Sequence, residues 1–327
     1  MTAATMEVVA GLLRDPARSF VLTTHTNADG DAIGSMLGLG RALRAAGRTV
    51  HYWHFDAVPV RDDLAFLLEA GERISHDAHV GGATLIALDC ATAGRMGEVE
   101  PSSLGSPVIN IDHHHDNTRF GDVDLVVDDA SSTAEIVATL LQTAGIPLTE
   151  SIATPLYVGI VTDTGRFGYA NVAPATLRIA ADLVAAGADI PAICRSLYEE
   201  TPLGATRLLG AALTGVRLIA DGRVALASLN QAALAEAGSD SSDGAVEALR
   251  SIQGVEVAAV LRSVSVDDRQ WRISMRASSS EVDVSAVARE RSGGGHRAAA
   301  GCTADGDLAA VLGWLEPALT AALSEQR

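Results

Sequence analysis

In its first half, the chain alternates short apolar runs with longer segments of helical pattern. The apolar runs cover residues 19–24, 49–55, 83–89 and 107–112, and helices are predicted over residues 31–46 and 131–143. Short apolar runs are typical of strands buried on both faces, and strands that alternate with helices form a mostly parallel sheet. The first half therefore predicts an α/β fold, in which a mostly parallel sheet carries helices on both faces.

The second half changes character. From about residue 174 to 220 the pattern is mainly helical, and strand-like runs return after residue 222. A length of 327 residues is typical of about two domains. We predict an N-terminal α/β domain at residues 1–188, a helical connector at 189–221 and a smaller C-terminal α/β domain at 222–327.

Charge narrows the classes of partner. The formal net charge is −17, and all 24 basic residues are arginine. Affinity for duplex DNA and for anionic membranes depends on basic residues, so this charge argues against both as partners. Without lysine, the chain can form neither a Schiff base nor a Walker-type phosphate loop. Any bound phosphate must be held by arginine, histidine, backbone amides or metal ions.

Cysteine usage and hydropathy indicate a reducing, aqueous compartment. Cys90, Cys194 and Cys302 are odd in number, far apart and outside any CxxC motif, which argues against a disulfide framework or a zinc knuckle. No run of about 18 or more uncharged apolar residues is present, so no transmembrane helix is predicted. We expect a cytoplasmic protein.

The segment HTNADGDAIGS lies where the first predicted strand is followed by a helix. It offers His25, Asp29 and Asp31 within seven residues, and Gly30 allows a tight backbone turn between them. Imidazole and carboxylate groups are suitable ligands for a divalent ion such as Mn²⁺. The alternative is a polar turn in which Asp31 only caps the helix.

A second segment, DHHH, begins at the end of the strand-like run at residues 107–112. Neutral imidazoles of His113 and His114 can bind metal while Asp112 orients one of the two rings. The alternative is a surface loop, and we assign no role to the third histidine, His115. The histidines outside these motifs are predicted to be surface or packing residues: His51, His54, His76 and His79.

Two isolated aspartates complete the candidate ligands. Asp89 ends a strand-like run and Asp163 lies in the segment GIVTDTGRF, although each alone is typical of a helix cap or a turn. Together, the candidates are enough for two ions that share one bridging carboxylate: His25, Asp29, Asp31, Asp89, His113 and Asp163. A two-metal centre of this kind suits in-line displacement at phosphorus.

The segment SGGGHRAAAG near the C-terminus is a candidate phosphate-binding loop. The backbone at Gly294 and Gly295 can approach a phosphate closely, His296 offers a side-chain contact, and the N-terminus of a following helix would favour an anion. Arg276, in an earlier strand-like run, is a second candidate phosphate ligand. The alternatives are a flexible loop and a solvated strand arginine.

In order and spacing, HTNADGDAIGS, LDC, DHHH and TDTGRF resemble the four motifs of DHH phosphoesterases. The segment GGGH resembles the signature of the domain often attached to their C-terminus. The resemblance covers nearly the whole chain and looks most like the compact NrnA-type members, which are oligoribonucleases and phosphatases of 3′-phosphoadenosine 5′-phosphate (pAp). It implies a catalytic domain at residues 1–188, a substrate-binding domain at 222–327, a site between the two domains, and a homodimer.

The resemblance also implies roles for the candidate residues. It implies two Mn²⁺ ions that share Asp89 as a bridging ligand. One ion would be held by His25, Asp29 and Asp89, and the other by Asp31, Asp89, His113 and Asp163. Three residues would take part in catalysis: Asp89, Asp112 and His114. Four residues would contact the substrate: Arg276, Gly294, Gly295 and His296.

The implied reaction is hydrolysis of short oligoribonucleotides (nanoRNA, or linear dinucleotides such as pApA) to mononucleotides, and of pAp to AMP and phosphate. Some members of the family degrade cyclic di-AMP, which adds a further candidate substrate. Three alternatives stay open: an inorganic pyrophosphatase, a RecJ-like single-strand exonuclease and a cyclic-dinucleotide sensor without catalysis. A fourth, aminoacyl-tRNA editing, would share only the GGGH-type domain and leaves the N-terminal ligand cluster unexplained. The absence of lysine and the GGGH segment argue against the pyrophosphatase, and the complete ligand set argues against the sensor.

Overall fold

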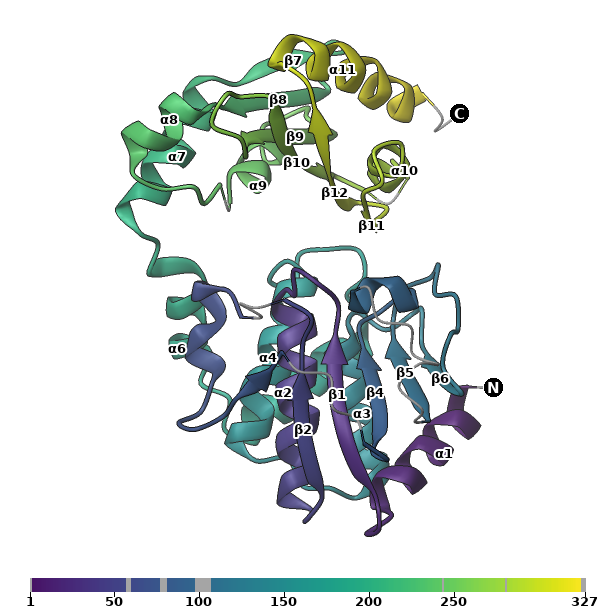
Figure 1. The fold of residues 1–327 in the computed structure, drawn as a ribbon. Helices are drawn as coiled ribbons and strands as arrows, with labels where there is room; N and C mark the ends of the chain where they lie inside the picture. Colours follow the sequence, from purple (N-terminus) through teal and green to yellow (C-terminus); the bar gives the residue numbers. More distant parts are fainter. Residues whose placement is uncertain are drawn as a thin grey trace. The chain divides into compact units, whose positions relative to one another are not determined.

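The computed structural model describes residues 2–56, 60–76, 81–97, 107–242, 244–279 and 281–324. It divides into two compact units, Met1–Glu200 and Thr201–Arg327, and each contains a six-stranded sheet (Figure 1). The predicted α/β architecture, with a parallel sheet followed by a second α/β domain, is confirmed. The boundaries expected from the sequence, with a separate connector, stay a prediction.

The sheet of the N-terminal unit is parallel throughout and has the strand order β3-β2-β1-β4-β5-β6. Its strands are β1 (Ser19–Thr24), β2 (Thr49–Trp53), β3 (Ile74–Ser75), β4 (Thr84–Leu88), β5 (Val108–Asp112) and β6 (Val123–Val126). The order reverses between β1 and β4, whose last paired residues are Thr24 and Leu88. Open α/β sheets bind ligands at such reversal points, beyond the carboxyl ends of the strands.

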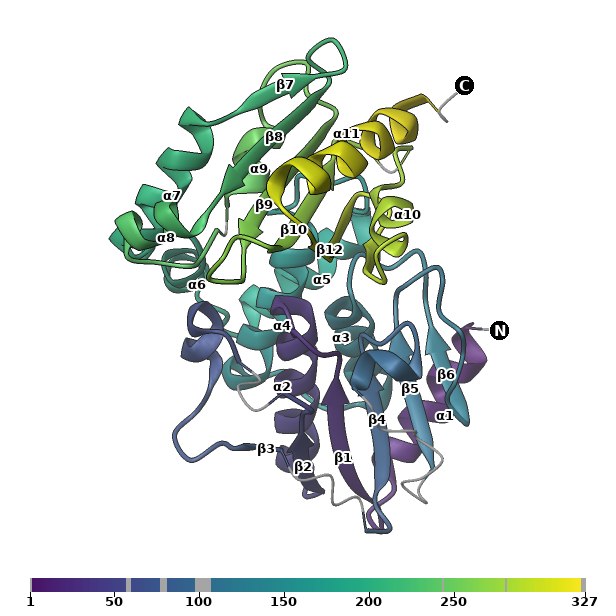
Figure 2. The ribbon, with the colours of Figure 1, turned by 45° about the horizontal axis from the view of Figure 1, so that its top comes forward.

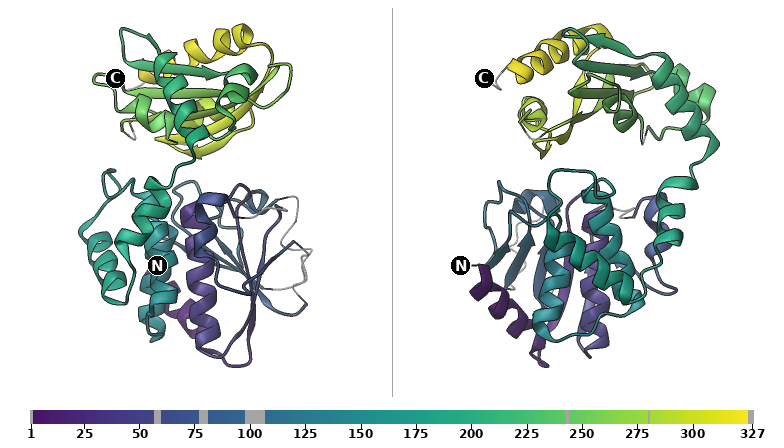
Figure 3. Two further views of the ribbon diagram at one scale, coloured as in Figure 1. Left: turned by 90° about the vertical axis from the view of Figure 1, so that its left-hand side faces the viewer. Right: turned by 180° about the vertical axis from the view of Figure 1, so that it is seen from behind.

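Among the described residues, most helices lie on one face of this sheet (Figure 3, left), and a 3₁₀-helix lies on the other. Those on the first face include α1 (Thr2–Arg14), α2 (Gly30–Ala45), α3 (Thr133–Ala144) and α4 (Glu150–Asp163). Their apolar side chains and those of alternate strand residues, such as Leu22, form one buried cluster. On the opposite face, Val21 and Leu85 form a second cluster with Met96 of the 3₁₀-helix η2 (Ala93–Met96). The pleat of each strand thus directs neighbouring side chains to two different cores.

Glycine allows α2 and α4 to pack closely (Figures 1 and 2). A Cβ atom on Gly34 would lie 2.3 Å from the carbonyl oxygen of Pro155, closer than van der Waals contact permits. The two helices run antiparallel, since Gly30 at the start of α2 lies beside Thr162 near the end of α4. This packing brings the first turn of α2 and the last turn of α4 together.

Within the described residues, the N-terminal unit has four further helical segments. They are η1 (Asp62–Leu67), α5 (Pro174–Ala185), α6 (Ile190–Cys194) and the π-helical turn η4 (Arg195–Glu199). The proline at the start of α5 and the one in the first turn of α6 lie where a helix loses no hydrogen bond to proline. The mainly helical pattern predicted from about residue 174 is thereby confirmed.

The C-terminal unit contains a mixed sheet with the order β11-β12-β10-β9-β8-β7, in which β8 and β9 are parallel and the other neighbours antiparallel. Its strands are β7 (Arg217–Ile219), β8 (Val224–Leu229), β9 (Val257–Ser263), β10 (Gln270–Ala277), β11 (Gly294–His296) and β12 (Ala299–Asp305). Its helices are α7 (Leu203–Thr214), α8 (Gln231–Ala237), α9 (Ala245–Arg250), α10 (Val284–Arg289) and α11 (Leu308–Ser324). Within the described residues, no helix is long and apolar enough to cross a membrane.

The GGGH segment forms an edge hairpin. Strand β11 pairs antiparallel with β12, from Gly294 opposite Gly301 to His296 opposite Ala299. The expectation that a helix follows this segment is therefore wrong, because the next element is strand β12. Gly295 (φ +133°) is needed for this pairing, since a Cβ atom there would lie 2.4 Å from the carbonyl oxygen of Ala299.

Candidate metal centre

Strands β1, β4 and β5 are neighbours in the sheet (Figure 1), and candidate ligands directly follow their carboxyl ends. His25 follows β1, Asp89 follows β4, and His113 follows β5. Because these strands are neighbours in one parallel sheet, their last residues lie along the same edge. Helix α2 begins and helix α4 ends at this edge, which adds Asp31 and Asp163.

The first ligand group consists of His25, Asp29 and Asp89. His25 Nε2 lies 3.4 Å from Asp89 Oδ2 and 3.9 Å from Asp29 Oδ2. Asp29 also caps α2, because its Oδ1 accepts hydrogen bonds from the amides of Asp31 and Ala32. Its other oxygen, Oδ2, is the one that faces His25. The structure thus brings together the three residues expected for one ion.

The second ligand group surrounds His113. Its Nε2 lies 3.5 Å from Asp89 Oδ1, 3.6 Å from Asp163 Oδ2 and 3.9 Å from Asp31 Oδ2. Asp89 therefore presents Oδ2 to the first group and Oδ1 to the second. The four residues expected for the second ion lie together, and Asp89 lies where a bridging ligand is expected. The roles of these residues as ligands stay predictions.

Five non-glycine residues of the candidate motifs have left-handed backbone conformations, and two of them, Asn27 and Asp89, belong to the motifs of the first ligand group. Asn27 has φ +56° and Asp89 has φ +60°, values that residues other than glycine seldom adopt. The amide of Asp89 donates to the carbonyl of Ile111, which ties this turn to β5. Strain of this kind persists only where the surrounding structure enforces it, and it is typical of functional sites.

Burial and crowding shift the carboxyl groups in opposite directions. Burial, with the negative charges of Asp89 and Asp163, raises the pKa of Asp31 well above its ordinary range. Burial raises the pKa of Asp163 to about 7, although the charge of His113 opposes it. Burial also acts to raise the pKa of Asp89, but the hydrogen bond from His25 and nearby histidine charges hold that pKa well below its usual value. The carboxyl groups disfavour one another's charge, a condition that a divalent cation relieves.

The same carboxylates also shift the pKa of the three histidines in the site. Burial acts to lower the pKa of His25, His113 and His114, but the neighbouring carboxylates outweigh burial and raise the pKa of each ring. The largest opposing influence is the hydrogen bond with Asp89 for His25 and the hydrogen bond with Asp112 for His114. Negative potential therefore dominates the site, and it attracts cations.

The donor set fits divalent ions. Asp31 and Asp89 are only 1% and 2% exposed, and buried carboxylates are costly unless they are paired or coordinate a metal. Within each group of three, such as Asp31, Asp89 and His113, the ligand atoms lie within 4.8 Å of one another. Carboxylate and imidazole donors together suit Mn²⁺ and similar ions better than metals that prefer thiolates.

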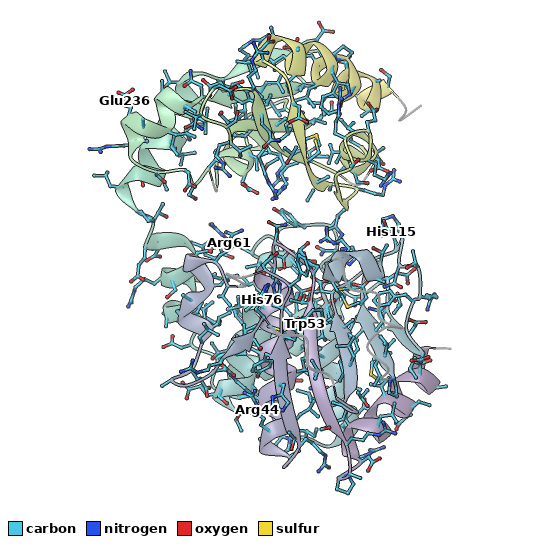
Figure 4. The ribbon with its side chains drawn as sticks, in the orientation of Figure 1. Arg44, Trp53, Arg61, His76, His115 and Glu236 are labelled. Carbon is cyan, nitrogen blue, oxygen red and sulfur yellow. The ribbon has the colours of Figure 1, made fainter. Side chains whose placement is uncertain are left out.

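A hydrogen-bonded chain orients His114. Its Nδ1 lies 2.8 Å from Asp112 Oδ1, and Asp112 Oδ2 accepts a hydrogen bond of 2.6 Å from the side-chain amide of Asn117. Asp112 thus orients one ring, as the sequence predicts, whereas Asn117 escaped sequence reasoning although it lies five residues beyond Asp112. The same side-chain amide of Asn117 also donates to Asn110 Oδ1 at 2.8 Å. The next histidine, His115, is exposed (Figure 4).

His54 is a second residue that sequence reasoning missed. The sequence predicts a surface or packing residue, and His54 is fully buried. The prediction did not include its contact with the first ligand group, in which its Nε2 lies 3.0 Å from the carbonyl oxygen of His25. Its Nδ1 accepts a hydrogen bond from the amide of Asp56, which makes Nε2 the donor. His54 therefore fixes the backbone of the first ligand group. The sequence indicated this role only through the position of His54 directly after β2, the strand beside β1. Of the other histidines named with it, His79 lies outside the described residues.

The expected substrate residues belong to the C-terminal unit. Arg276 lies on β10, where its Nε donates to Glu247 Oε1 (3.0 Å) and its Nη1 donates to the carbonyl of Met275 (3.0 Å). It is thus a paired, half-buried arginine rather than a solvated one. The other three residues form β11: Gly294, Gly295 and His296. Their contact with substrate stays a prediction.

Comparison with known proteins identifies similar sequences along most of the chain. The model of the N-terminal domain of the DHH family matches residues 19–160, and that of the DHHA1 domain matches residues 224–322. The chain is 37% identical to the "Bifunctional oligoribonuclease and PAP phosphatase NrnA" of Thermus thermophilus, over 92% of this chain and 89% of that protein. It is 29% identical to the protein of the same name from Bacillus subtilis, over 87% of this chain and 89% of that protein.

Solved structures are similar in fold. An exopolyphosphatase-related protein from Bacteroides fragilis has a TM-score of 0.89 and 25% identity, over 99% of this chain and 98% of that one. RecJ from Thermus thermophilus, in complex with Mn²⁺, has a TM-score of 0.51 and 16% identity, over 98% of this chain and 55% of that one. The second similarity concerns the fold alone.

Proposed function

Because the chain belongs to the DHH family and is therefore a metal-dependent phosphoesterase, we propose that it hydrolyses short oligoribonucleotides to mononucleotides and pAp to AMP and phosphate. The observation that carries the proposal is the pair of ligand groups that share Asp89. The substrate classes are supported by the names of two relatives that are similar over most of their length. Cyclic di-AMP is a further candidate substrate.

We assign two Mn²⁺ ions to the two ligand groups. His25, Asp29 and Asp89 would hold one ion, with Asp89 shared. Asp31, Asp89, His113 and Asp163 would hold the other. Two divalent ions in such a centre lower the pKa of a water molecule and neutralise charge on the phosphoryl oxygens.

The protein itself supplies orientation and a proton. Asp112 holds His114 through Nδ1, so Nε2 is the atom assigned to protonate the leaving oxygen. The raised pKa of His114, in which the hydrogen bond with Asp112 outweighs burial, favours the protonated ring that this role requires. Proton transfer from a positioned imidazole contributes about 10²–10⁴-fold to the rate. Asp112 and Asn117 thus act on catalysis through the direction of this ring.

In the C-terminal unit, we assign substrate contacts to Arg276, His296 and the backbone at Gly294 and Gly295. Glu247 and the carbonyl of Met275 hold the guanidinium of Arg276 at two of its nitrogens, which fixes the plane of the group. A guanidinium held in this way loses little conformational freedom when it binds phosphate. The total absence of lysine makes this arginine the basic residue to test first.

Asp89→Asn tests the proposal, because Asn keeps the shape of the side chain and removes the charge shared by the two groups. We expect kcat/KM for pAp with Mn²⁺ to fall by about 100-fold or more, since each ion contributes several kcal/mol of charge stabilisation. Asp182→Asn is the matched control, because Asp182 lies on α5 and accepts an exposed hydrogen bond from Gln142. Near-wild-type hydrolysis by Asp89→Asn, with the protein folded, would refute the two-metal assignment.

Substrate choice is tested on one preparation with Mn²⁺. We expect higher kcat/KM for pAp and end-labelled diadenylate than for inorganic pyrophosphate. Preferential release of phosphate from pyrophosphate would support the pyrophosphatase alternative instead. Tight binding of cyclic di-AMP without turnover of any of these compounds would support the sensor. Cyclic di-AMP hydrolysis at a similar kcat/KM would add it to the substrates.

A further inference from the structure

The start of helix α3 contacts the carboxylates of both ligand groups. The amides of Thr133 and Ala134 donate to Asp31 Oδ2 (2.7 Å) and Asp31 Oδ1 (2.9 Å). The hydroxyl of Thr133 donates to Asp89 Oδ1 at 3.0 Å. Thr133 is fully buried. Thr133, which lies outside the sequence motifs, thus contacts both Asp89, the carboxylate shared by the two groups, and Asp31 of the second group.

The first turn of α3 is itself held firmly. Ser132 caps the helix through the amide of Glu135 (3.1 Å). Glu135 Oε2 accepts hydrogen bonds from the hydroxyls of Ser131 (2.6 Å) and Thr176 (2.8 Å), and all of these groups are buried. These bonds restrict movement of the helix start, so the hydroxyl of Thr133 approaches Asp89 from a fixed direction.

We infer that Thr133 is a positioning residue that sets the direction of the Asp89 carboxylate, and that its hydroxyl strengthens Mn²⁺ binding. Asp89 Oδ1 faces His113, so it is the oxygen that an ion of the second group would contact. Because the hydroxyl of Thr133 donates to this same oxygen, the ion has to approach the oxygen from another direction. Hydrogen bonds that orient metal ligands typically contribute about 10–100-fold to metal affinity or activity. The inference deepens the proposed function and rests on its metal centre.

Thr133→Val isolates the hydroxyl, because valine has nearly the same shape and keeps the amide that donates to Asp31. The hydroxyl of Thr139, on the same helix, donates to the backbone carbonyl of Glu135 (2.9 Å) and not to a candidate ligand, so Thr139→Val is the matched control. Thr133→Ser restores a hydroxyl at the tested position. Mn²⁺ affinity of each full-length protein is measured by calorimetry, and kcat and KM for pAp are measured in parallel.

We expect Thr133→Val to weaken Mn²⁺ binding by about 10-fold, with most of the lost activity regained at high Mn²⁺. Thr133→Ser and Thr139→Val should keep near-wild-type affinity. Wild-type Mn²⁺ affinity in folded Thr133→Val, or an equal loss in Thr139→Val, would overturn the inference. If Thr133→Val does not fold, Thr133→Ala decides by the same criterion. A wild-type protein that binds Mn²⁺ but hydrolyses neither pAp nor short RNA would refute the proposed function and leave the affinity comparison valid.

Discussion

At the scale of single residues, Arg41 and Glu72 form a buried ion pair in the N-terminal unit, outside the metal centre. Arg41 on α2 donates to Glu72 Oε2 at 2.6 Å, and the hydroxyl of Tyr52 donates to Glu72 Oε1 at 3.1 Å. The side chains of Arg41 and Glu72 are 8% and 5% exposed, so water screens the pair weakly. Burial acts to raise the pKa of Glu72, but the hydrogen bonds from Arg41 outweigh burial and lower it below 4.5.

This pair predicts a pH-dependent contribution to stability. Because the pKa of Glu72 is lower in the folded state, its contribution is complete above its unfolded value of 4.5 and is lost as the pH falls through the folded value. Glu72→Gln should therefore lower the free energy of unfolding at pH 7 by about 2–3 kcal/mol. The difference from wild type should shrink as the pH falls below 4.5. Urea unfolding of both proteins at a series of pH values measures the loss of stability at pH 7 and its dependence on pH.

Glu69→Gln is the control for this prediction. Glu69 lies 3.4 Å from the same arginine but is 54% exposed. An exposed ion pair contributes about 0–1 kcal/mol, so this variant should unfold almost as the wild type does. A difference between wild type and Glu72→Gln that stays constant down to acidic pH would contradict the role given to the Glu72 charge.

At the scale of elements, the approach of α2 to α4 assembles the second ligand group. Asp31 lies in the first turn of α2 and Asp163 is the last residue of α4, and the two helices meet through glycine. A side chain at Gly34 would strike the backbone of Pro155, which cannot yield as the end of a flexible side chain can. The distance between these helices therefore determines whether the two carboxylates can serve one ion.

Gly34→Ala should separate the two helices. We expect the free energy of unfolding to fall by about 1–3 kcal/mol through overpacking, and Mn²⁺ affinity to fall with it. Gly11→Ala on α1 is the matched control, because a Cβ atom at Gly11 would meet nothing within 4 Å. That variant should gain up to about 1 kcal/mol from helix propensity alone. Thermal unfolding and calorimetric Mn²⁺ titration of both variants measure the effect, and equal stability of the two would contradict this account.

At the scale of the whole molecule, net charge bears on substrate length. Four acidic residues are assigned to the metal centre: Asp29, Asp31, Asp89 and Asp163. Two divalent ions would add four positive charges and change the formal charge from −17 to −13. The remaining excess repels a long polyanion more than it repels a dinucleotide, whose few phosphates can all lie near the metal ions.

We therefore expect RNAs of about two to five nucleotides to be hydrolysed roughly 10-fold faster than an RNA of about 24 nucleotides at equal concentration. Higher salt should narrow the difference, because it screens the repulsion. Initial rates with end-labelled RNAs at two salt concentrations measure both effects. Faster hydrolysis of the long RNA would favour the RecJ-like alternative.

Much of the fold and of the candidate ligand set could be predicted from the amino-acid sequence. Short continuous apolar runs are typical of strands buried on both faces, so the runs that lead to His25, Asp89 and Asp112 predict a parallel sheet with its polar residues at one edge. The same strand ends predict which carboxylates and imidazoles can meet, because the carboxyl ends of parallel strands share an edge. These inferences depend on local pattern, which a single sequence contains.

The tertiary structure alone decided how those side chains are directed and supported. Thr133 meets Asp89 across 44 residues of chain, and His54 meets the backbone of His25 across 29. Such contacts depend on how close two helices or strands pack, and no short-range pattern encodes that distance. The same holds for β11, where pairing with β12 replaced an expected loop and helix. The sequence by itself determined the chemistry available at the edge of the sheet, and long-range packing determined its geometry.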